Sequence, residues 1–383
     1  MATVSMEKPA AVATKRMLSL DVLRGVTMAF MILVNNNGWH AYWPFEHADW
    51  NGWTPTDIVF PTFLFLVGVT IVISLESRFA KGASTPDVLP KIFRRAVLLF
   101  AIGIFLAVFP FFHWSQMRIY GVLQRIAACY LVGSLLYLWG RRLKKPAVPL
   151  MALLVVLLVG YYVMMRWVPV PSYGMPGRDI PFLDKDRNMV AVLDRHLHWG
   201  RLWEKTRDPE GLLSTFPAIG TTLLGMMAAL WMRTERTLRQ KCAGMLGAGV
   251  VLLVLGELWN PWFPINKKLW TSSFVLLMAG WSLVLWAFFM WLTEIKGWKR
   301  GTGFWLVFGM NAIASYAMSD LLAAPLWAIS MGPHETFGYW LYLHSFAYVH
   351  PPGVASLLYS IWFVLMCWLP MAVLYRMKIF LKV

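Results

Sequence analysis

Long apolar runs alternate with short polar connections along the whole chain. Ten of these runs are long enough to cross a membrane as helices, since about 20 apolar residues span the hydrocarbon core. The predicted spans are residues 18–36, 56–76, 92–111, 119–139, 147–166, 211–231, 242–259, 271–292, 303–322 and 355–375. The pattern therefore predicts an all-α, polytopic transmembrane helix bundle over residues 18–383. A short tail precedes it at residues 1–17, and one long connection, residues 167–210, is predicted to form an external cap.

The composition agrees with a membrane protein. Of the 383 residues, 58% are hydrophobic and only 14% are charged, whereas soluble domains are about 45–50% apolar. The three Cys residues have no metal-ligand spacing, and neither a zinc motif nor a phosphate-binding Gly loop occurs. We therefore predict no metal site.

Basic residues mark one end of the predicted bundle. They follow the even-numbered spans, including the tenth and last, at Arg78, Lys81, Lys91, Arg94, Arg95, Arg141, Arg142, Lys144, Lys145, Arg233, Arg236, Arg239, Lys241, Lys296, Lys299, Arg300, Arg376, Lys378 and Lys382. The opposite short connections contain few, so the positive-inside rule predicts that both termini are cytoplasmic. Because the net charge of +16 is divided among short loops, nucleic-acid binding is not expected.

A polar island, residues 34–65, separates the first two apolar runs. It contains two His and three acidic residues, no Lys or Arg, and many aromatic residues. Such a mixture is more typical of a folded pocket or an interfacial belt than of a solvated loop. Within it, His47 is close in sequence to Glu46, Asp49 and Asp57. A carboxylate beside an imidazole can fix the tautomer and raise the basicity, as a general base or acyl acceptor requires.

Charged side chains also fall inside predicted spans. Asp21 and Arg24 are three residues apart and can pair on one face of the first helix, and Arg24 can reach the headgroups. This favours a helix-end anchor over a ligand site. Arg125 lies about one turn inside the fourth span. There it is either the partner of an acid such as Asp57 or Asp49, or the cation of a functional site.

Three further patterns have ordinary structural explanations. Asp208, Pro209 and Glu210 precede the sixth span and match the residue types that begin helices. Residues 266–270 contain two Lys and a Trp, which are as typical of membrane-interface anchors as of a binding site. Asn311 falls inside the ninth span, where an interhelical hydrogen bond is favoured over substrate contact.

Several short motifs occur in one order along the chain. They are Arg16-Met-Leu-Ser-Leu-Asp21-Val-Leu-Arg24-Gly25, Val34-Asn35, His47-Ala-Asp-Trp50-Asn51-Gly52, Asp57-Ile-Val-Phe60-Pro61, Gly121-Val-Leu-Gln124-Arg125, Asp208-Pro-Glu-Gly211, Asn266-Lys-Lys-Leu-Trp270, Gly309-Met-Asn311 and Leu374-Tyr-Arg-Met-Lys-Ile-Phe380. No single motif is decisive, but the ordered set closely resembles the heparan-alpha-glucosaminide N-acetyltransferase family and covers almost the whole chain.

The resemblance implies a membrane-embedded acetyltransferase. Members of the family take acetyl from cytosolic acetyl-CoA and deliver it to the amino group of a glucosamine-type sugar across the membrane. The family's catalytic His corresponds to His47, with Asp57 as our candidate for orienting it. Asn35 matches the Asn that follows the first span, and the run of three Asn leaves Asn36 as an alternative. The residues predicted to bind acetyl-CoA are Asn35, Arg24, Gln124, Arg125 and Asn311.

The chain differs from the eukaryotic enzyme in ways that bear on its location. It has no extra luminal domain or additional span before Arg16, no glycosylation sequon and a shorter cap loop. These differences favour a bacterial inner-membrane homologue that acts on its acceptor at the periplasmic side, and they leave the identity of the acceptor sugar open. The expected partners are acetyl-CoA, an amino sugar and membrane lipid, and a homodimer stays an open alternative.

The expected mechanism follows from the shape of acetyl-CoA. Its nucleotide is too polar to cross a bilayer, but its pantetheine arm is long and thin. If Arg24, Arg94 and Arg95 hold the phosphates, the thioester can reach into the bundle toward His47. The alternative for these residues is ordinary positive-inside charge, which is favoured more for Arg94 and Arg95 than for Arg24. His47 then either accepts the acetyl group or removes a proton from the acceptor amine, and Asp57 either orients His47 or only caps the second span.

A rival function is an amino-sugar permease of the same fold, and a membrane scaffold is a weaker alternative. Transporters often contain inverted repeats with matched interrupted helices. No second copy of the 16–25 motif or of the polar island occurs in this sequence. The sequence therefore favours the enzyme.

Overall fold

The computed structural model describes residues 17–143, 145–197, 200–333 and 335–381. Residues 1–16 of the predicted tail, including Arg16, lie outside the described residues. The long helices are α1 (Leu18–Asn35), α2 (Val59–Phe79), α3 (Thr85–Val108), α4 (Val122–Gly140), α5 (Ala147–Trp167), α7 (Leu212–Met232), α8 (Leu238–Trp259), α9 (Ser272–Met290), α11 (Ala312–Ala328) and α13 (Pro352–Arg376). The short elements are η1 (Trp43–Phe45), η2 (Pro55–Ile58), η3 (Trp114–Gln116), α6 (Met189–Leu197), η4 (Trp291–Ile295), α10 (Thr302–Met310), β1 (Ser330–Gly332), β2 (Glu335–Thr336) and α12 (Phe337–Ser345).

The all-α prediction is confirmed. Among the described residues, eight helices are long and apolar enough to cross a membrane, and a bent pair of helices would make a ninth span. The helix α3 occupies the third predicted span and is long enough, but Lys91, Arg94 and Arg95 lie in its first half. The two short strands β1 and β2 form one small antiparallel hairpin.

The ninth predicted span is not one straight helix. The helices α10 and α11 meet at Met310 and Asn311 with a bend of 84°. Hydropathy could not predict this bend, because both arms are apolar. The side chain of Asn311 explains how the break is held: its Nδ2 donates to Ile379 O at 3.0 Å and its Oδ1 accepts from Leu381 N at 2.9 Å. The break therefore fixes the C-terminal segment against the bundle.

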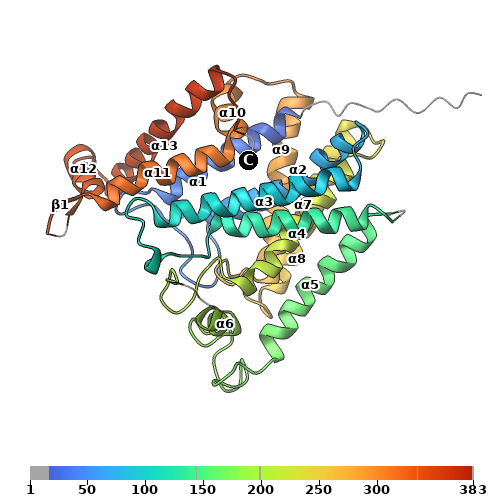
Figure 1. Cartoon of the computed structure of the whole chain (residues 1–383), viewed down its shortest axis with the longest axis horizontal. Helices are drawn as coiled ribbons and strands as arrows, with labels where there is room; N and C mark the ends of the chain where they lie inside the picture. Colours follow the sequence, from blue (N-terminus) through green and yellow to red (C-terminus); the bar gives the residue numbers. More distant parts are fainter. Residues whose placement is uncertain (1–16, 144, 198–199, 334, 382–383) are drawn as a thin grey trace, which may run out of the picture.

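The two ends of the bundle are chemically different. At one end Glu76 of α2 pairs with Arg141 after α4 and with Arg233 after α7. We call this the basic end. The opposite end, which we call the cap end, contains the polar island and the cap loop 167–210. Figure 1 shows α1 to α4 running side by side between these ends, with α6 of the cap loop below them. The helices therefore alternate in direction as the loop charges predict.

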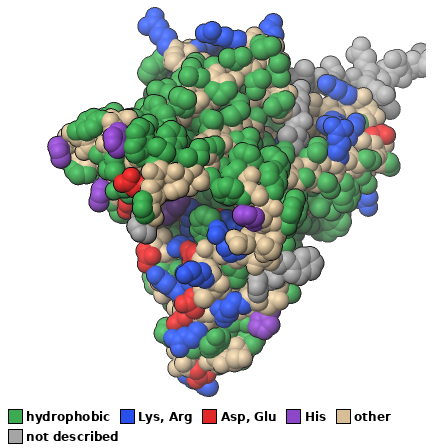
Figure 2. Space-filling view, turned by 60° about the vertical axis from the view of Figure 1, so that its left-hand side comes forward, with side chains coloured by type: hydrophobic (Ala, Val, Ile, Leu, Met, Phe, Trp, Pro, Cys, Tyr) green, Lys and Arg blue, Asp and Glu red, His purple; other side chains and the backbone are tan. Residues whose placement is uncertain are grey.

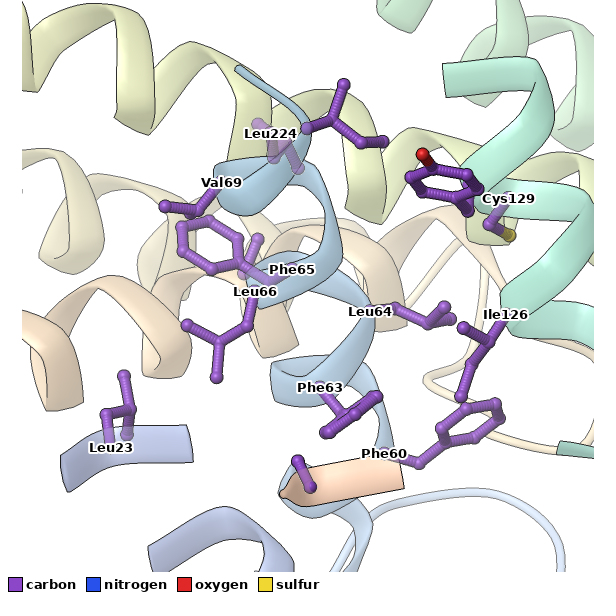
Figure 3. Packing of buried hydrophobic residues seen from close by; sticks show 14 of the residues in the cluster. Leu23, Phe60, Phe63, Leu64, Phe65, Leu66, Val69, Ile126, Cys129 and Leu224 are labelled. Carbon is purple, nitrogen blue, oxygen red and sulfur yellow. The ribbon is translucent and has the colours of Figure 1, made fainter. Parts of the chain in front are cut away.

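The helix α2 lies at the centre of the bundle. Figure 3 shows Leu64 and Phe60 pointing toward Ile126 of α4. On the other side of α2, Leu66 points toward Leu23 of α1. By contrast α5 and α8 keep most of their apolar side chains exposed, as lipid-facing helices do. The position of α2 matters because its first turn belongs to the polar island and its last turn to the basic end.

Close packing against α7 fixes α2. A Cβ on Gly68 would lie 2.0 Å from Thr222 O, and a Cβ on Gly225 would lie 2.0 Å from Phe65 O. Only glycine allows the two backbones to approach so closely, which is typical of packing between membrane helices. Any side chain at either position would push the helices apart and shift the first turn of α2.

The cap loop folds back onto the polar island. Trp50 Nε1 donates to Leu183 O at 2.8 Å, and Lys185 Nζ pairs with Asp49 Oδ2 at 2.7 Å. Figure 2 looks toward this part of the molecule and shows charged side chains gathered on the lower lobe. The surface is hollowed between this lobe and the apolar part above it. The cap loop thus forms one wall of a depression at the cap end.

Candidate active site

His47 and Asp57 form a hydrogen-bonded pair at the cap end. His47 Nδ1 lies 2.8 Å from Asp57 Oδ1, and Asp57 is fully buried whereas 44% of the His47 side chain is exposed. A carboxylate only accepts hydrogen bonds, so His47 donates to Asp57 in the tautomer that has its proton on Nδ1, and the lone pair of that neutral ring is on Nε2. The pair therefore has the geometry of an oriented base or nucleophile.

The two oxygen atoms of Asp57 have different partners. Oδ2 accepts from Thr54 N at 3.0 Å, Ala48 N at 3.1 Å and Thr54 Oγ1 at 3.3 Å, which forms a capping box at the start of η2. Oδ1 is left for His47 and for Lys267 Nζ at 3.2 Å. Both alternatives for Asp57 therefore apply, because one oxygen caps the helix and the other orients the imidazole.

Lys267 places a positive charge beside the imidazole. Its Nζ lies 2.8 Å from His47 Nδ1 and 3.3 Å from Nε2. Desolvation by the surrounding protein lowers the pKa of His47 below 6.5, and the Lys267 charge lowers it further, against the raising effect of Asp57. Burial also lowers the pKa of Lys267, and Asp57 and Glu210 oppose this. At neutral pH the imidazole is therefore held in the neutral form that a base or nucleophile needs.

Lys267→Met is expected to move the acid limb of the pH–rate profile to higher pH. A basic His47 is active when neutral, so the rate falls as the pH drops through its pKa, which lies below 6.5 in the wild type. Loss of the neighbouring charge raises that pKa by about one unit or more. Rates measured between pH 5 and 8 check this, with Lys268→Met as control, since Lys268 pairs with Glu204 at 2.8 Å. An unshifted limb in Lys267→Met would contradict the role of Lys267.

The turn before α7 has a different role from the one predicted. The N-cap of α7 is Gly211, with no side-chain cap bond, so Asp208 and Glu210 do not begin the helix. Asp208 instead binds Arg118 in a bidentate pair, Nε–Oδ2 2.8 Å and Nη2–Oδ1 2.5 Å. Glu210 Oε2 also accepts from Arg118 Nη2. The carboxylates thus build an ionic cluster that joins the cap loop to the segment before α4.

Arg125 is buried and pairs with neither of the acids considered from sequence. Its Nη2 donates to Gly211 O at 3.2 Å and to Ser214 Oγ, and its guanidinium lies 5.0 Å from the ring centre of Trp270. Nε and Nη1 have no hydrogen-bond partner among the described residues. Trp270 is itself only 1% exposed, so it is not an interface anchor. A buried cation with two unpartnered donors is unusual among protein side chains.

A cavity of about 570 Å³ opens between α1, α2, α3, α4 and the α10–α11 break. Its lining includes five basic residues and no Asp or Glu among the described ones. The basic residues are Arg24, Arg78, Lys91, Arg94 and Arg95. The apolar part of the lining includes Phe63, Leu66 and Leu99. The cavity thus combines a cationic mouth at the basic end with an apolar interior, as a site for an anion with a long tail would.

The other predicted site residues lie around this cavity or apart from it. Arg24 pairs with Asp21 at 3.3 Å, as predicted, and it also donates to Gly309 O at 3.3 Å and lines the cavity. Gln124 is buried, and its amide fills the space beside Gly103 and Gly121. It therefore packs α3 against α4.

Neither Asn311 nor Asn35 joins His47. The Asn311 amide is used by the C-terminal segment, although its neighbours Met310 and Ala312 line the cavity. Asn35 is exposed at the end of α1, and no hydrogen bond links its amide to another described residue. Asn36 binds Ile32 O of its own helix. Their roles with acetyl-CoA stay predictions.

Sequence reasoning missed Lys267, Glu210 and Arg118 as parts of one site. Lys267 and Glu210 had local explanations, no separate role was predicted for Arg118, and the three residues are far apart in the chain. The same holds for Arg78 and Lys91, which were interpreted only as topology charges. The available signal was the scarcity of basic residues in the short cap-end connections, where Arg118, Lys267 and Lys268 are exceptional.

The fold and the site together define an integral membrane protein with an ionic site at one end of its bundle and a basic cavity at the other. Residues 16–259 match the family described as heparan-alpha-glucosaminide N-acetyltransferase, catalytic. The chain is similar to heparan-alpha-glucosaminide N-acetyltransferase of Homo sapiens, 31% identical over 352 residues, which are 79% of this chain and 52% of that protein. The Mus musculus protein of that name is 29% identical over 360 residues, 81% of this chain and 54% of that protein.

The chain therefore belongs to the heparan-alpha-glucosaminide N-acetyltransferase family, and the resemblance seen in the motifs is confirmed. It spans about half the length of the curated relatives that it matches.

Proposed function

We propose that the protein transfers acetyl from cytosolic acetyl-CoA to the amino group of a glucosamine-type sugar on the other side of the membrane. One observation carries the proposal: α2 connects a basic cavity at one end of the bundle to the His47–Asp57 pair at the other. A donor with an anionic head and a reactive tail suits that arrangement. The family membership supports the same chemistry.

Acetyl-CoA matches the cavity in size and charge. A volume of about 570 Å³ is within the usual range of about 300–1,000 Å³ for small-molecule sites. The phosphates would bind Arg78, Arg94 and Arg95, since guanidinium groups suit phosphate oxygens. The lining along α2 runs from Arg78 inward to Phe63, roughly 22 Å at 1.5 Å per residue. The pantetheine arm would occupy this apolar stretch.

The thioester would then approach His47. Phe63 is roughly 10 Å from Asp57 along the helix axis. Arg125 would lie next to this path. The residue after it, Ile126, lines the cavity, and the guanidinium of Arg125 lies over Trp270. We assign the free Nε and Nη1 of Arg125 to the acetyl carbonyl oxygen, where a positive charge stabilises the oxyanion that develops during attack.

The reaction exchanges an acetyl group for a proton. The amine nitrogen forms a bond to the carbonyl carbon, the C–S bond breaks, and the ammonium form of the acceptor loses two protons in total. One proton joins the thiolate to give CoA, and the other is released. His47 Nε2 takes part either as the base for the amine or as a first acyl acceptor, and in both courses it must be neutral when it acts.

The basic end would face the cytoplasm, because the positive-inside rule assigns Arg141, Arg233 and their neighbours to that side. Acetyl-CoA would then bind from the cytoplasm of a bacterial cell, and the amino sugar would bind at the periplasmic side of the inner membrane. Both termini of the chain would be cytoplasmic.

Release of CoA tests the function directly. Purified protein in detergent is expected to release free CoA from acetyl-CoA when glucosamine is added, and to form N-acetylglucosamine in equal amount. The competing function is a permease. If no CoA is released but vesicles that contain the protein accumulate labelled glucosamine, the acetyltransferase proposal is wrong.

Arg95→Gln is expected to weaken acetyl-CoA binding by about 10- to 100-fold, because a hydrogen bond to a charged group contributes about 1.5–3 kcal/mol. The Arg95 guanidinium lies over the ring of Tyr130, and both residues line the cavity. Its buried Nε has no hydrogen-bond partner among the described residues. Arg142→Gln is the control, since Arg142 is exposed at the same end outside the cavity. Equal affinities of the two variants, measured by calorimetry, would exclude the cavity as the phosphate site.

A further inference from the structure

Glu210 is a carboxylate at the cap end that the mechanism above does not use. It lies in the turn between the cap loop and α7, with a side chain that is 13% exposed. Its Oε2 accepts from Arg118, while Oε1 has no hydrogen-bond partner among the described residues and is not enclosed by protein. One oxygen therefore remains available to a ligand.

Arg118 does not need Glu210 for its own pairing. Asp208 already binds the guanidinium through two oxygen atoms, and Asp208 is further fixed by Trp203 N at 3.1 Å. A bidentate pair of this kind satisfies an arginine. The cluster therefore holds the Glu210 carboxylate in place, although Arg118 does not need that carboxylate to neutralise its charge.

Glu210 is joined by a chain of contacts to the segment beside His47. Its charge raises the pKa of His47 in the polar island and of Lys267 before α9. The carbonyl oxygen of Gly211, the next residue, accepts from Arg125 at 3.2 Å, and Arg125 lies over Trp270, three residues after Lys267. Because Lys267 Nζ lies 2.8 Å from His47 Nδ1, these contacts join the turn that contains Glu210 to the segment beside His47.

The acceptor of an N-acetylation is an amine, and amines carry a positive charge in neutral water. The carboxylate of Asp57 is committed to His47, Lys267 and its capping bonds, and that of Asp208 to Arg118 and the backbone. We propose, on the basis of the acetyltransferase function above, that Glu210 binds the ammonium group of the acceptor and holds it beside His47. Glu210 is therefore the residue that selects an amino sugar over its hydroxyl analogue.

The test compares Glu210→Gln with Glu204→Gln in the purified full chain. Glu204 is a matched control: it is a cap-loop carboxylate with a side chain 19% exposed that pairs with Lys268, as Glu210, 13% exposed, pairs with Arg118. Glu210→Gln is expected to raise the KM for glucosamine about 10- to 100-fold, the loss of one charged hydrogen bond. The affinity of Glu210→Gln for acetyl-CoA and its inhibition constant for glucose should both stay within about threefold of the wild-type values. A change of that size is smaller than the loss of one charged hydrogen bond would cause. Glu204→Gln should change none of the three.

The outcomes separate the inference from the function on which it rests. A wild type without glucosamine-dependent CoA release refutes the function itself. An active wild type with an unchanged glucosamine KM in Glu210→Gln refutes only the inference. A parallel change in the constants for glucosamine, glucose and acetyl-CoA also refutes it, because that marks a structural role. Glu210→Asp, which keeps the charge, should recover part of the glucosamine affinity, and it serves as the test if Glu210→Gln does not fold.

Discussion

His47→Ala is expected to lower the rate of acetyl transfer by about 10²- to 10⁴-fold, the usual contribution of a general base, and by more if His47 carries the acetyl group. The variant should still fold and bind acetyl-CoA with unchanged affinity. The cavity is lined by other residues, and 44% of the His47 side chain is exposed. CoA release at saturating substrates measures the rate, and calorimetry measures acetyl-CoA binding.

His40→Ala is the matched control for this experiment. His40 belongs to the same polar island, is exposed and has a positive φ of 62°, and no acidic side chain of the described residues binds it. Its loss should change the rate little. If His47→Ala instead keeps nearly full activity, His47 is not catalytic, and the search should move to Arg125 and Asn311.

Asp57→Asn is expected to lower the rate of acetyl transfer by about 10²- to 10⁴-fold, which is the same effect as that of His47→Ala. Asn can retain the capping bonds to Thr54 and Ala48 through its carbonyl oxygen. Its amide nitrogen would then face His47 Nδ1 and donate to it, which moves the ring proton to Nε2. The imidazole would keep its place with the wrong nitrogen protonated, so the rate should fall more than substrate binding.

Two comparisons separate orientation from capping. Thr54→Val removes the hydroxyl that binds Asp57 Oδ2 at 3.3 Å and Glu46 O at 2.6 Å, so it should lower thermal stability but not the rate per folded molecule. The double variant of His47→Ala with Asp57→Asn should be little slower than either single variant, because residues that act as a unit are not additive. A normal rate in Asp57→Asn with lowered stability would leave Asp57 with the capping role alone.

Much of the fold follows from hydropathy and charge. The alternation of apolar runs with basic and non-basic loops predicted the helices and their directions. Two pairs are also close enough in sequence to predict. Asp21 and Arg24 are three residues apart on one face of a helix, and His47 and Asp57 are ten residues apart in the polar island. The bend at Met310–Asn311 could not be predicted in this way, because apolar composition does not depend on helix direction.

The remainder of the site depends on distant parts of the chain. Glu210 matches helix-start chemistry locally, but the bundle places it beside Arg118, which lies before α4. Lys267 appears in a run typical of membrane anchors, yet the fold places it 2.8 Å from His47 Nδ1. Local patterns describe only what a residue can do for its own segment. Its partners in the site are fixed by how the helices pack.

Acetyl transfer across a sealed membrane is the most direct test of the account. Vesicles containing the protein would be loaded with glucosamine, and acetyl-CoA would be added outside. Some protein molecules will be inserted with Arg141 and the rest of the basic end facing the outside of the vesicle. These molecules should release CoA outside while N-acetylglucosamine forms inside. Formation of N-acetylglucosamine only when both substrates are on the same side, or escape of unmodified glucosamine without release of CoA, would contradict it.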